Sequence, residues 1–189
     1  NLWLATANGI SKYDGGIFSR YQHATRNQNA SLDNINTLYV DSSNTLWVGT
    51  QNRGLNYYDK IHNRFVPMLL PNINSNINAI IGTDNGNLWL GTENGLHHLD
   101  TLKKKLINDI AMTKSLAGKF VTALLLSKNS TLWIATKKGG YKYNLKNKNF
   151  NYIDAKPSDM AGLDQYSLTA LEEDNSGGIW LGTLATGVK

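Results

Sequence analysis

The sequence contains no cysteine, only three prolines and no apolar run of the length that a membrane-spanning helix requires, about 18 residues. Without cysteine, disulfide bonds and thiolate metal sites are excluded, and the redox compartment cannot be read from a pairing pattern. On composition alone, periplasm and cytoplasm both stay open. We expect this segment to be soluble and any targeting sequence to lie outside it.

Charged residues are also scarce, at 17% of the chain, with a formal net charge of +5. Lysine and arginine are scattered, and their one run is Lys103–Lys105. A nucleic-acid-binding surface gathers such residues on one face or element, so we expect no nucleic-acid partner for this segment. Lys103–Lys105 is interpreted as a solvated turn or strand edge.

Glycine and asparagine are abundant, and they separate short apolar runs. This pattern is typical of many strands joined by polar turns. A five-residue word built around tryptophan also recurs, and it includes all five tryptophans of the chain. Its copies are Leu2–Thr6, Leu46–Thr50, Leu88–Thr92, Leu132–Thr136 and Ile179–Thr183. The tryptophans lie 42 to 47 residues apart, which is the period of a β-propeller blade.

Other positions keep phase with the tryptophan. An apolar strand begins twelve residues before each later tryptophan, a polar turn such as Asp41–Asn44 follows it, and a glycine comes six or seven residues after the tryptophan. A third strand then ends in an aromatic–acid pair such as Tyr58–Asp59, and a fourth contains Phe65 or its counterpart. A longer polar loop is expected before the next repeat. Four antiparallel strands per repeat make one blade.

The predicted fold class is therefore all-β, a β-propeller fragment with four-stranded antiparallel blades and a period of about 44 residues. We expect residues 1–189 to form a partial propeller. Complete blades are predicted at 35–66, 77–107 and 121–153, and incomplete blades at 1–21 and 168–189. Natural propellers close with about four to eight blades, so we expect the sequence to be cut from a longer one. The tryptophans are expected in the core between blades, not in a sugar-stacking role.

The repeat resembles a known family. The word LW[LVI][AG]T followed by Gly-Leu or Gly-Ile, the INxL strand at Ile35–Leu38 and the Tyr-Asp pair are similar to the two-component regulator propeller repeat. Ser31–Asn34 also resembles the family's Ser-Leu lead into the first strand, whereas the corresponding Asn72–Asn76 is shorter and lacks the leucine. The resemblance covers essentially the whole chain.

This resemblance implies a sensory function. In the family, large two-propeller ectodomains form the periplasmic sensor half of hybrid two-component histidine kinases, common in gut Bacteroidetes, and detect oligosaccharides released from glycans. It therefore implies a periplasmic ligand-sensing segment of a membrane-anchored receptor that controls polysaccharide utilisation. No kinase, receiver or DNA-binding motif is present, so kinase activity is implied only for a parent chain. The expected partners are an oligosaccharide and the remaining blades, and a homodimer is left open.

The sequence contains no recognisable catalytic motif. The histidines, His23, His62, His97 and His98, have no metal-ligand spacing. The adjacent pair Glu172–Glu173 lies in a predicted strand, where neighbouring side chains point to opposite faces. We therefore expect no catalytic residue, no metal and no cofactor in this segment, which is predicted not to be an enzyme.

Ligand-binding residues are expected at the axial mouth of the propeller, where the loops that lead into first strands and those between second and third strands converge. Amide and guanidinium groups there suit sugar hydroxyls or uronate carboxylates, because they offer several donors in planar arrays. The candidates are Arg26, Asn27, Gln51, Asn52, Arg53, Glu93, Asn94, Lys137 and Lys138.

Two other functions stay open. One is a propeller lyase or hydrolase of the streptogramin-lyase-like type, because such propellers share Leu-Trp-rich repeats; it would need an axial histidine with an acidic or metal partner. The other is a protein-interaction scaffold, whose signature would be an exposed apolar patch.

Overall fold

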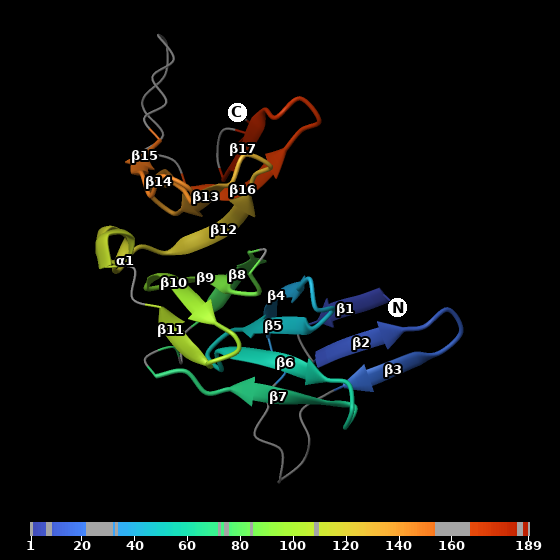
Figure 1. The fold of residues 1–189 in the computed structure, drawn as a ribbon. Coiled ribbons are helices and arrows are strands. Elements are labelled where there is room, and N and C mark those ends of the chain that lie inside the picture. Colours follow the sequence, from blue (N-terminus) through green and yellow to red (C-terminus); the bar gives the residue numbers. More distant parts are fainter. Residues whose placement is uncertain are drawn as a thin grey trace. The chain divides into compact units, whose positions relative to one another are not determined.

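The computed structural model of the chain describes residues 2–6, 9–21, 32, 34–71, 73, 76–83, 85–107, 110–153, 167–184 and 187–188. Within these residues, eighteen strands form five sheets, and the strands of every sheet are neighbours in chain order (Figure 1). The strand pairs whose register is resolved are all antiparallel. The predicted all-β propeller fold class is therefore confirmed.

The sheets have the following strands. The first contains β1 (Leu2–Thr6), β2 (Gly9–Tyr13) and β3 (Phe18–Tyr21), and the second contains β4 (Ile35–Val40), β5 (Leu46–Thr50), β6 (Leu55–Asp59) and β7 (Arg64–Met68). The third contains β8 (Ile77–Gly82), β9 (Leu88–Thr92), β10 (Gly95–Asp100) and β11 (Lys105–Ile107). The fourth contains β12 (Val121–Leu126), β13 (Thr131–Thr136), β14 (Gly139–Asn144) and β15 (Phe150–Tyr152). The fifth contains β16 (Leu168–Glu173), β17 (Ile179–Thr183) and β18 (Gly187–Val188).

The turn between the first two strands of a sheet has one backbone conformation in four sheets. Its fourth residue adopts a positive φ, which a two-strand connection of this kind requires and which glycine and asparagine tolerate best. These residues are Asn44 (φ 60°), Gly86 (80°), Ser130 (63°) and Gly177 (86°). In each turn the amide N–H of this residue donates to the carbonyl three positions earlier, at 2.8 to 3.2 Å. The recurring polar turn of the sequence is thus a recurring backbone geometry.

The chain divides into two compact units, Asn1–Leu90 with Leu99–Ile107, and Gly91–His98 with Asn108–Lys189. In the first unit, Ile10 of the first sheet packs with Val48 and Tyr58 of the second in one buried cluster. On the opposite face of the second sheet, Trp47 and Leu55 pack with Ile77 of β8. The second sheet is therefore covered on both faces, as a blade in a stack must be.

In the second unit, the fourth and fifth sheets share a smaller cluster. Ala135 of β13, Leu168 of β16 and Leu181 of β17 are its buried members. Thr122 of β12 also donates a hydrogen bond from Oγ1 to the carbonyl of Leu168, at 2.6 Å. Side-chain packing and one polar contact thus join these two sheets.

Two expectations from the sequence are wrong in detail. A polar loop was expected after β11, but Ile110–Leu116 forms α1, the one helix among the described residues. Met112 and Leu116 lie one turn apart on this helix and are both fully buried, so an apolar stripe stabilises it. The core position expected for every tryptophan holds for Trp47 and Trp89, but Trp180 is 51% exposed. About half of the Trp180 surface is therefore open to solvent, although its indole N–H donates to Oδ2 of Asp174 at 2.9 Å.

The close approach of neighbouring sheets explains the small fourth residue of the repeated word. A Cβ atom added to Gly49 would lie 2.6 Å from Cγ2 of Thr37, 2.7 Å from Cγ2 of Ile77 and 3.0 Å from the carbonyl oxygen of Ile77. Ile77 belongs to the next sheet, so its backbone fixes the space. The distance between neighbouring sheets therefore decides whether the fourth residue of the word can be alanine or must be glycine. The five copies of the word contain both residues at this position.

We predict that Gly49→Ala lowers the free energy of unfolding by about 1 to 3 kcal/mol, because the added methyl group overpacks the interface with β8. Gly16→Ala is the matched control, since its Cβ would meet nothing closer than 4.0 Å. Urea unfolding of both variants measures the difference. Equal stability of Gly49→Ala and the parent chain would show that the two sheets can separate at no cost.

A second prediction concerns Asn56, which is 1% exposed and has neither amide atom hydrogen-bonded to a described residue. Since an unpaired buried amide is costly, Asn56→Leu should raise the free energy of unfolding by about 1 kcal/mol. Thr50→Val is the control, because the buried Thr50 hydroxyl does donate to the Gly54 carbonyl at 2.9 Å and its loss should destabilise. If Asn56→Leu destabilises as Thr50→Val does, the amide holds a bound partner such as water.

Candidate functional site

The loops between second and third strands, here called the mouth loops, are residues 51–53, 93–94 and 137–138. One buried hydrogen bond closes each of them, from the threonine hydroxyl that ends the second strand to the carbonyl of the glycine that precedes or begins the third. The bonds are Thr50 to Gly54 (2.9 Å), Thr92 to Gly95 (3.0 Å) and Thr136 to Gly139 (2.7 Å). The same bond occurs at Thr6–Gly9 and Thr183–Gly187. The threonine that ends the repeated word and the glycine three or four residues later therefore close the loop together.

The backbone of the mouth loops is also bound to the segments that lead into first strands. Gln51 donates its amide N–H to the carbonyl of Asn34 at 2.9 Å, and Asn52 donates to Oδ1 of Asn76 at 2.9 Å. Gly54 lies so close to this second segment that a Cβ would come within 2.9 Å of the Ile73 carbonyl oxygen. The loop 51–53 is therefore fixed at both sides while its side chains stay exposed.

In the second unit, the segment before β12 joins two mouth loops. Gly118 donates its amide N–H to the carbonyl of Asn94, and Lys137 donates its amide N–H to the carbonyl of Phe120, both at 3.0 Å. The predicted residues Asn94 and Lys137 are therefore held beside one connecting segment. Glu93 and Lys138 are their neighbours in the same two mouth loops.

The structure thus places seven of the nine predicted site residues on ordered loops. Gln51, Asn52 and Arg53 lie together on the β5–β6 loop of the first unit. The other four described candidates, Glu93, Asn94, Lys137 and Lys138, belong to the second unit. Arg26 and Asn27 lie outside the described residues.

Two mouth residues were missed by reasoning on the sequence. The Nζ atom of Lys137 lies 3.7 Å from the centroid of the Phe120 ring, and Nζ of Lys119 lies 5.6 Å from the centroid of Tyr141. Such cation–π contacts orient a lysine without neutralising it. Lys119 and Phe120 directly precede β12, so the strand pattern could have identified them as lining the same mouth.

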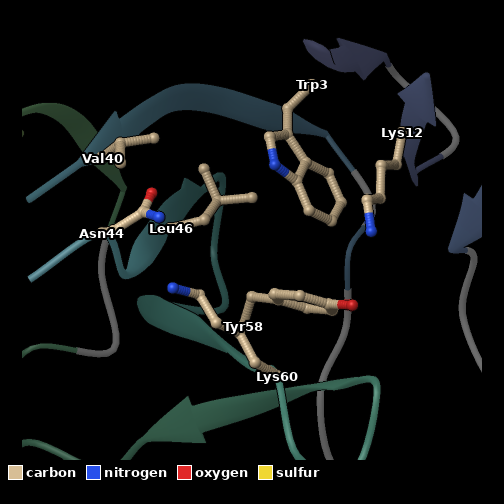
Figure 2. A pocket seen from close by; sticks show the side chains of 7 residues that line it. All are labelled: Trp3, Lys12, Val40, Asn44, Leu46, Tyr58 and Lys60. Carbon is tan, nitrogen blue, oxygen red and sulfur yellow. The ribbon is translucent and has the colours of Figure 1, made fainter. Parts of the chain in front are cut away.

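A separate pocket of about 520 Å³, here called the Trp3 pocket, lies between the first and second sheets (Figure 2). Its lining residues are Trp3, Lys12, Val40, Asn44, Leu46, Tyr58 and Lys60. Asn44 and Leu46 lie before and at the start of β5, whereas the mouth loop 51–53 follows the end of this strand. The Trp3 pocket and the mouth loop are therefore at opposite ends of β5.

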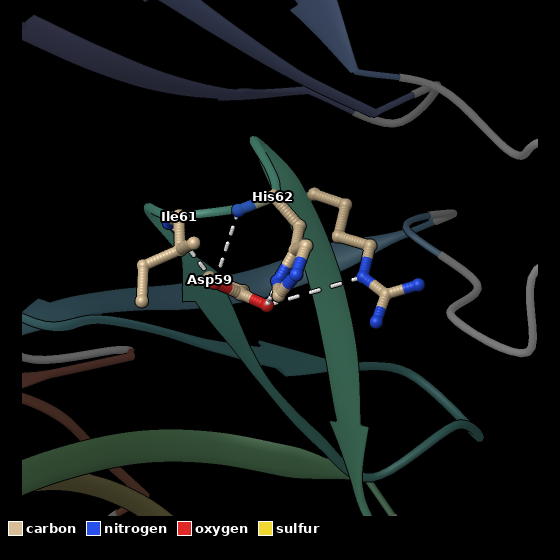
Figure 3. Close-up of polar contacts among 4 residues, drawn as sticks. Asp59, Ile61 and His62 are labelled. Carbon is tan, nitrogen blue, oxygen red and sulfur yellow. Dashed lines mark hydrogen bonds and ion pairs between the residues drawn. The ribbon is translucent and has the colours of Figure 1, made fainter.

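A carboxylate-centred turn at Asp59 lies between Tyr58 and Lys60, two residues that line the Trp3 pocket. Figure 3 shows its polar contacts. Oδ1 of Asp59 accepts hydrogen bonds from the amide N–H groups of Ile61 (3.0 Å) and His62 (3.2 Å). Oδ2 contacts Nδ1 of His62 at 2.6 Å and Nε of Arg64 at 3.9 Å. The side-chain hydrogen bond from His62 holds the pKa of Asp59 below its usual value. Both oxygens of this carboxylate are thus already engaged.

The histidines do not assemble a reactive centre in the described part of the chain. Among its residues, no three His, Asp or Glu side chains are grouped closely enough to hold a metal ion. Burial lowers the pKa of His97, which favours its neutral form. His62 is exposed on the Asp59 turn, and His23 lies outside the described residues. The described ranges also contain no helix with the length and hydropathy of a membrane span.

Two segments of the chain, residues 30–52 and 72–94, match the family model of the two component regulator propeller. Each segment contains one copy of the repeated tryptophan word and the strand before it. Two repeats of the chain therefore match this family, and the resemblance identified from its motifs is confirmed. No curated protein is significantly similar to the chain in sequence.

Solved structures share the fold. The extracellular domain of a protein provisionally described as a one component system from B. thetaiotaomicron is 23% identical with a TM-score of 0.80, over 98% of this chain and 25% of that chain. The corresponding domain of a provisionally described hybrid two component system from the same organism is 22% identical with a TM-score of 0.77, over 98% and 24%. Virginiamycin B lyase from Staphylococcus aureus is 17% identical with a TM-score of 0.68, over 99% and 64%. The chain thus spans about a quarter of the two extracellular domains.

Acid should destabilise the chain through its turn carboxylates. The pKa values of Asp14, Asp59, Asp100 and Asp174 are all lowered, chiefly by hydrogen bonds from Ile17, His62, Lys103 and Ser176, respectively. A lowered pKa in the folded state stabilises it above the unfolded pKa, and the contribution is lost as pH falls through the folded value. We therefore predict that Tm is insensitive to these groups between pH 5 and 7 and falls below about pH 4.

Thermal unfolding followed by circular dichroism from pH 7 to pH 2 measures this dependence. Asp59→Asn should show a smaller fall than the parent chain, because one of the four carboxylates no longer titrates. A Tm that rises on acidification would contradict the assigned hydrogen bonds.

Proposed function

Because the chain carries repeats of the two component regulator propeller family, we propose that it is a ligand-sensing propeller segment of a periplasmic receptor. In this proposal the receptor is a hybrid two-component sensor histidine kinase, and the ligand is an oligosaccharide whose presence controls polysaccharide utilisation. The match of two repeats to the family model supports the proposal most directly. The likeness of the fold to extracellular domains of provisionally described one- and two-component systems agrees with it.

The mouth loops supply chemistry that suits a sugar. Gln51 and Arg53 are exposed and together offer an amide and a guanidinium group, which bind hydroxyls and carboxylates through several parallel donors. In the second unit, Lys137 separately places an ammonium group over Phe120. Polar side chains on a rigid backbone are typical of binding loops, because the scaffold limits the entropy lost when the ligand is bound.

A rigid loop has a further consequence for signalling. The Thr50–Gly54 bond and the contacts with Asn34 and Asn76 leave the loop 51–53 little freedom to rearrange by itself. A ligand can shift the receptor between two arrangements only by binding one of them more tightly. In this proposal the difference comes from how the mouth loops of separate blades are spaced, not from a change within one loop.

The experiment is a thermal-shift screen of the purified chain against neutral and uronate-containing oligosaccharides. A true ligand at about a hundred times its Kd should raise Tm by several degrees. Arg53→Ala should weaken binding by about tenfold. Arg20→Ala is the matched control, because Arg20 is exposed on β3, away from the mouth loops.

The result that would contradict the proposal is the absence of any shift across the panel, or an equal loss of affinity in Arg53→Ala and Arg20→Ala. Mass spectrometry of the bound sugar after incubation distinguishes sensing from catalysis. A cleaved product would favour the lyase or hydrolase alternative in place of the sensor.

A further inference from the structure

We propose that the Trp3 pocket is a second ligand site, distinct from the mouth loops, and that it binds a small anion with a carboxylate on a six-membered ring. The proposal does not depend on the sensory function, because no residue of the pocket belongs to a mouth loop. The pocket combines the volume of a small-molecule site, aromatic walls and two lysines that form no ion pair.

The volume and walls of the pocket suit a compact ring. Its volume of about 520 Å³ falls within the usual range for small-molecule sites. The rings of Trp3 and Tyr58 lie 4.9 Å apart at an interplanar angle of 64°, so they form two walls that meet at an angle. Leu46, only 3% exposed, and Val40 add apolar surface. Such walls bind the flat face of a sugar or aromatic ring.

The aromatic walls are firmly positioned. The hydroxyl of Tyr58 donates to Oδ1 of Asn63 at 2.6 Å, and the same Asn63 atom accepts a hydrogen bond from Tyr21 at 2.7 Å. The Trp3 ring also packs edge-on against Phe65, with centroids 6.0 Å apart. Tyr58, only 8% exposed and with its hydroxyl engaged, therefore forms a fixed floor of the pocket, and Trp3 is the more accessible aromatic wall. The aromatic walls are preformed, which reduces the entropy cost of binding.

The two lysines give the pocket its charge. Nζ of Lys12 lies 5.5 Å from the Trp3 centroid and 6.0 Å from the Tyr58 centroid. In Figure 2 the amino groups of Lys12 and Lys60 lie on either side of the Tyr58 ring. No carboxylate lines the pocket, and neither lysine forms an ion pair with a described residue.

The neighbouring acids are engaged by other donors. Asp14 interacts electrostatically with Lys12, but its Oδ1 accepts the amide N–H groups of Gly16 at 3.1 Å and Ile17 at 2.9 Å, and it forms no ion pair with the lysine. Asp59 precedes Lys60 but binds His62 and Arg64, as described above. Asp41 accepts hydrogen bonds from the indole Nε1 of Trp47 and the amide N–H of Thr45, both at 2.8 Å. All three carboxylates are thus engaged by other donors. Two ammonium groups without an ion pair, one of them beside the rings of Trp3 and Tyr58, fit an organic anion better than a neutral ring or a cation.

Asn44 adds a neutral polar group at the rim. Its backbone has a positive φ of 60° and its amide N–H donates to the Asp41 carbonyl, so the turn fixes its position. The side-chain amide can donate to a hydroxyl or a carboxylate. A ring with a carboxylate and a further oxygen substituent would therefore use every polar group of the pocket.

The experiment records the indole N–H resonance of Trp3 by two-dimensional NMR of the ¹⁵N-labelled chain, assigned with the Trp3→Phe variant. The probes are digalacturonic acid, its neutral counterpart galactobiose, and benzoate. We expect digalacturonic acid or benzoate to shift the Trp3 resonance in a saturable manner and galactobiose to leave it unchanged. Binding by the uronide alone assigns a sugar acid, and binding by benzoate alone assigns an aromatic acid.

Two lysine variants and two control variants test the role of the lysines. Lys12→Met and Lys60→Met each retain an aliphatic side chain and should weaken binding by about tenfold. Lys105→Met is the matched control, because Lys105 is exposed on β11 outside the pocket and carries the same charge. Arg53→Ala should leave this binding unchanged, which separates the Trp3 pocket from the proposed mouth site.

Three results would each overturn the proposal. One is the absence of a saturable shift with both anions, and another is an equal shift with galactobiose. The third is an equal loss in Lys105→Met, which would mean that only the net charge of the chain attracts the anion. If Lys12→Met fails to fold, Lys60→Met decides the question, since Lys60 is an exposed turn residue.

Discussion

The close packing of one small sheet against the next is the constraint on which the rest of this structure depends. A four-stranded sheet cannot bury both of its faces alone, so the second sheet is covered by Ile10 on one face and by Ile77 on the other. At Gly49 the backbone of β8 comes so near that no side chain fits without displacement. The residues of the repeated word therefore reflect the short distance between neighbouring sheets. Its tryptophan fills the space between two sheets, and its small fourth residue allows the backbone of the next sheet to approach. Both requirements recur once in every blade.

This constraint also separates the residues that maintain the fold from those that are free to vary. The threonine that ends each word is turned inward to its glycine, so the loop between them begins and ends at fixed points. In the three mouth loops of the described residues, the side chains are exposed or partly exposed and differ from loop to loop: Gln51–Arg53, Glu93–Asn94 and Lys137–Lys138. One scaffold can thus present different polar groups at a constant position, which is the arrangement expected of a binding surface built from repeats.

The features that recur in every repeat could be predicted from the sequence. The period, the turns and the pairing of strands follow from positions that recur, and each matches a strand or turn of the structure. Helix α1 was missed because it occurs once, and the stripe formed by Met112 and Leu116 is too short to stand out. The Trp3 pocket was missed because it depends on the spacing of two sheets, which no linear pattern gives. Only the pair Trp3 and Lys12, directly opposite in β1 and β2, was accessible from strand register.

The fourth sheet shows which of these interactions determines the fold. In the second and fifth sheets, Asp41 and Asp174 accept the indole N–H of Trp47 and Trp180. In the fourth, Ser127 takes this place, and the buried Nε1 of Trp133 has no acceptor among the described residues. The strands around Trp133 pair as in the other sheets. An indole hydrogen bond contributes about 1 kcal/mol, whereas burial of a tryptophan contributes about 4 kcal/mol or more. Packing of the ring therefore holds the strand in place, and the fourth sheet forms without the indole–aspartate hydrogen bond.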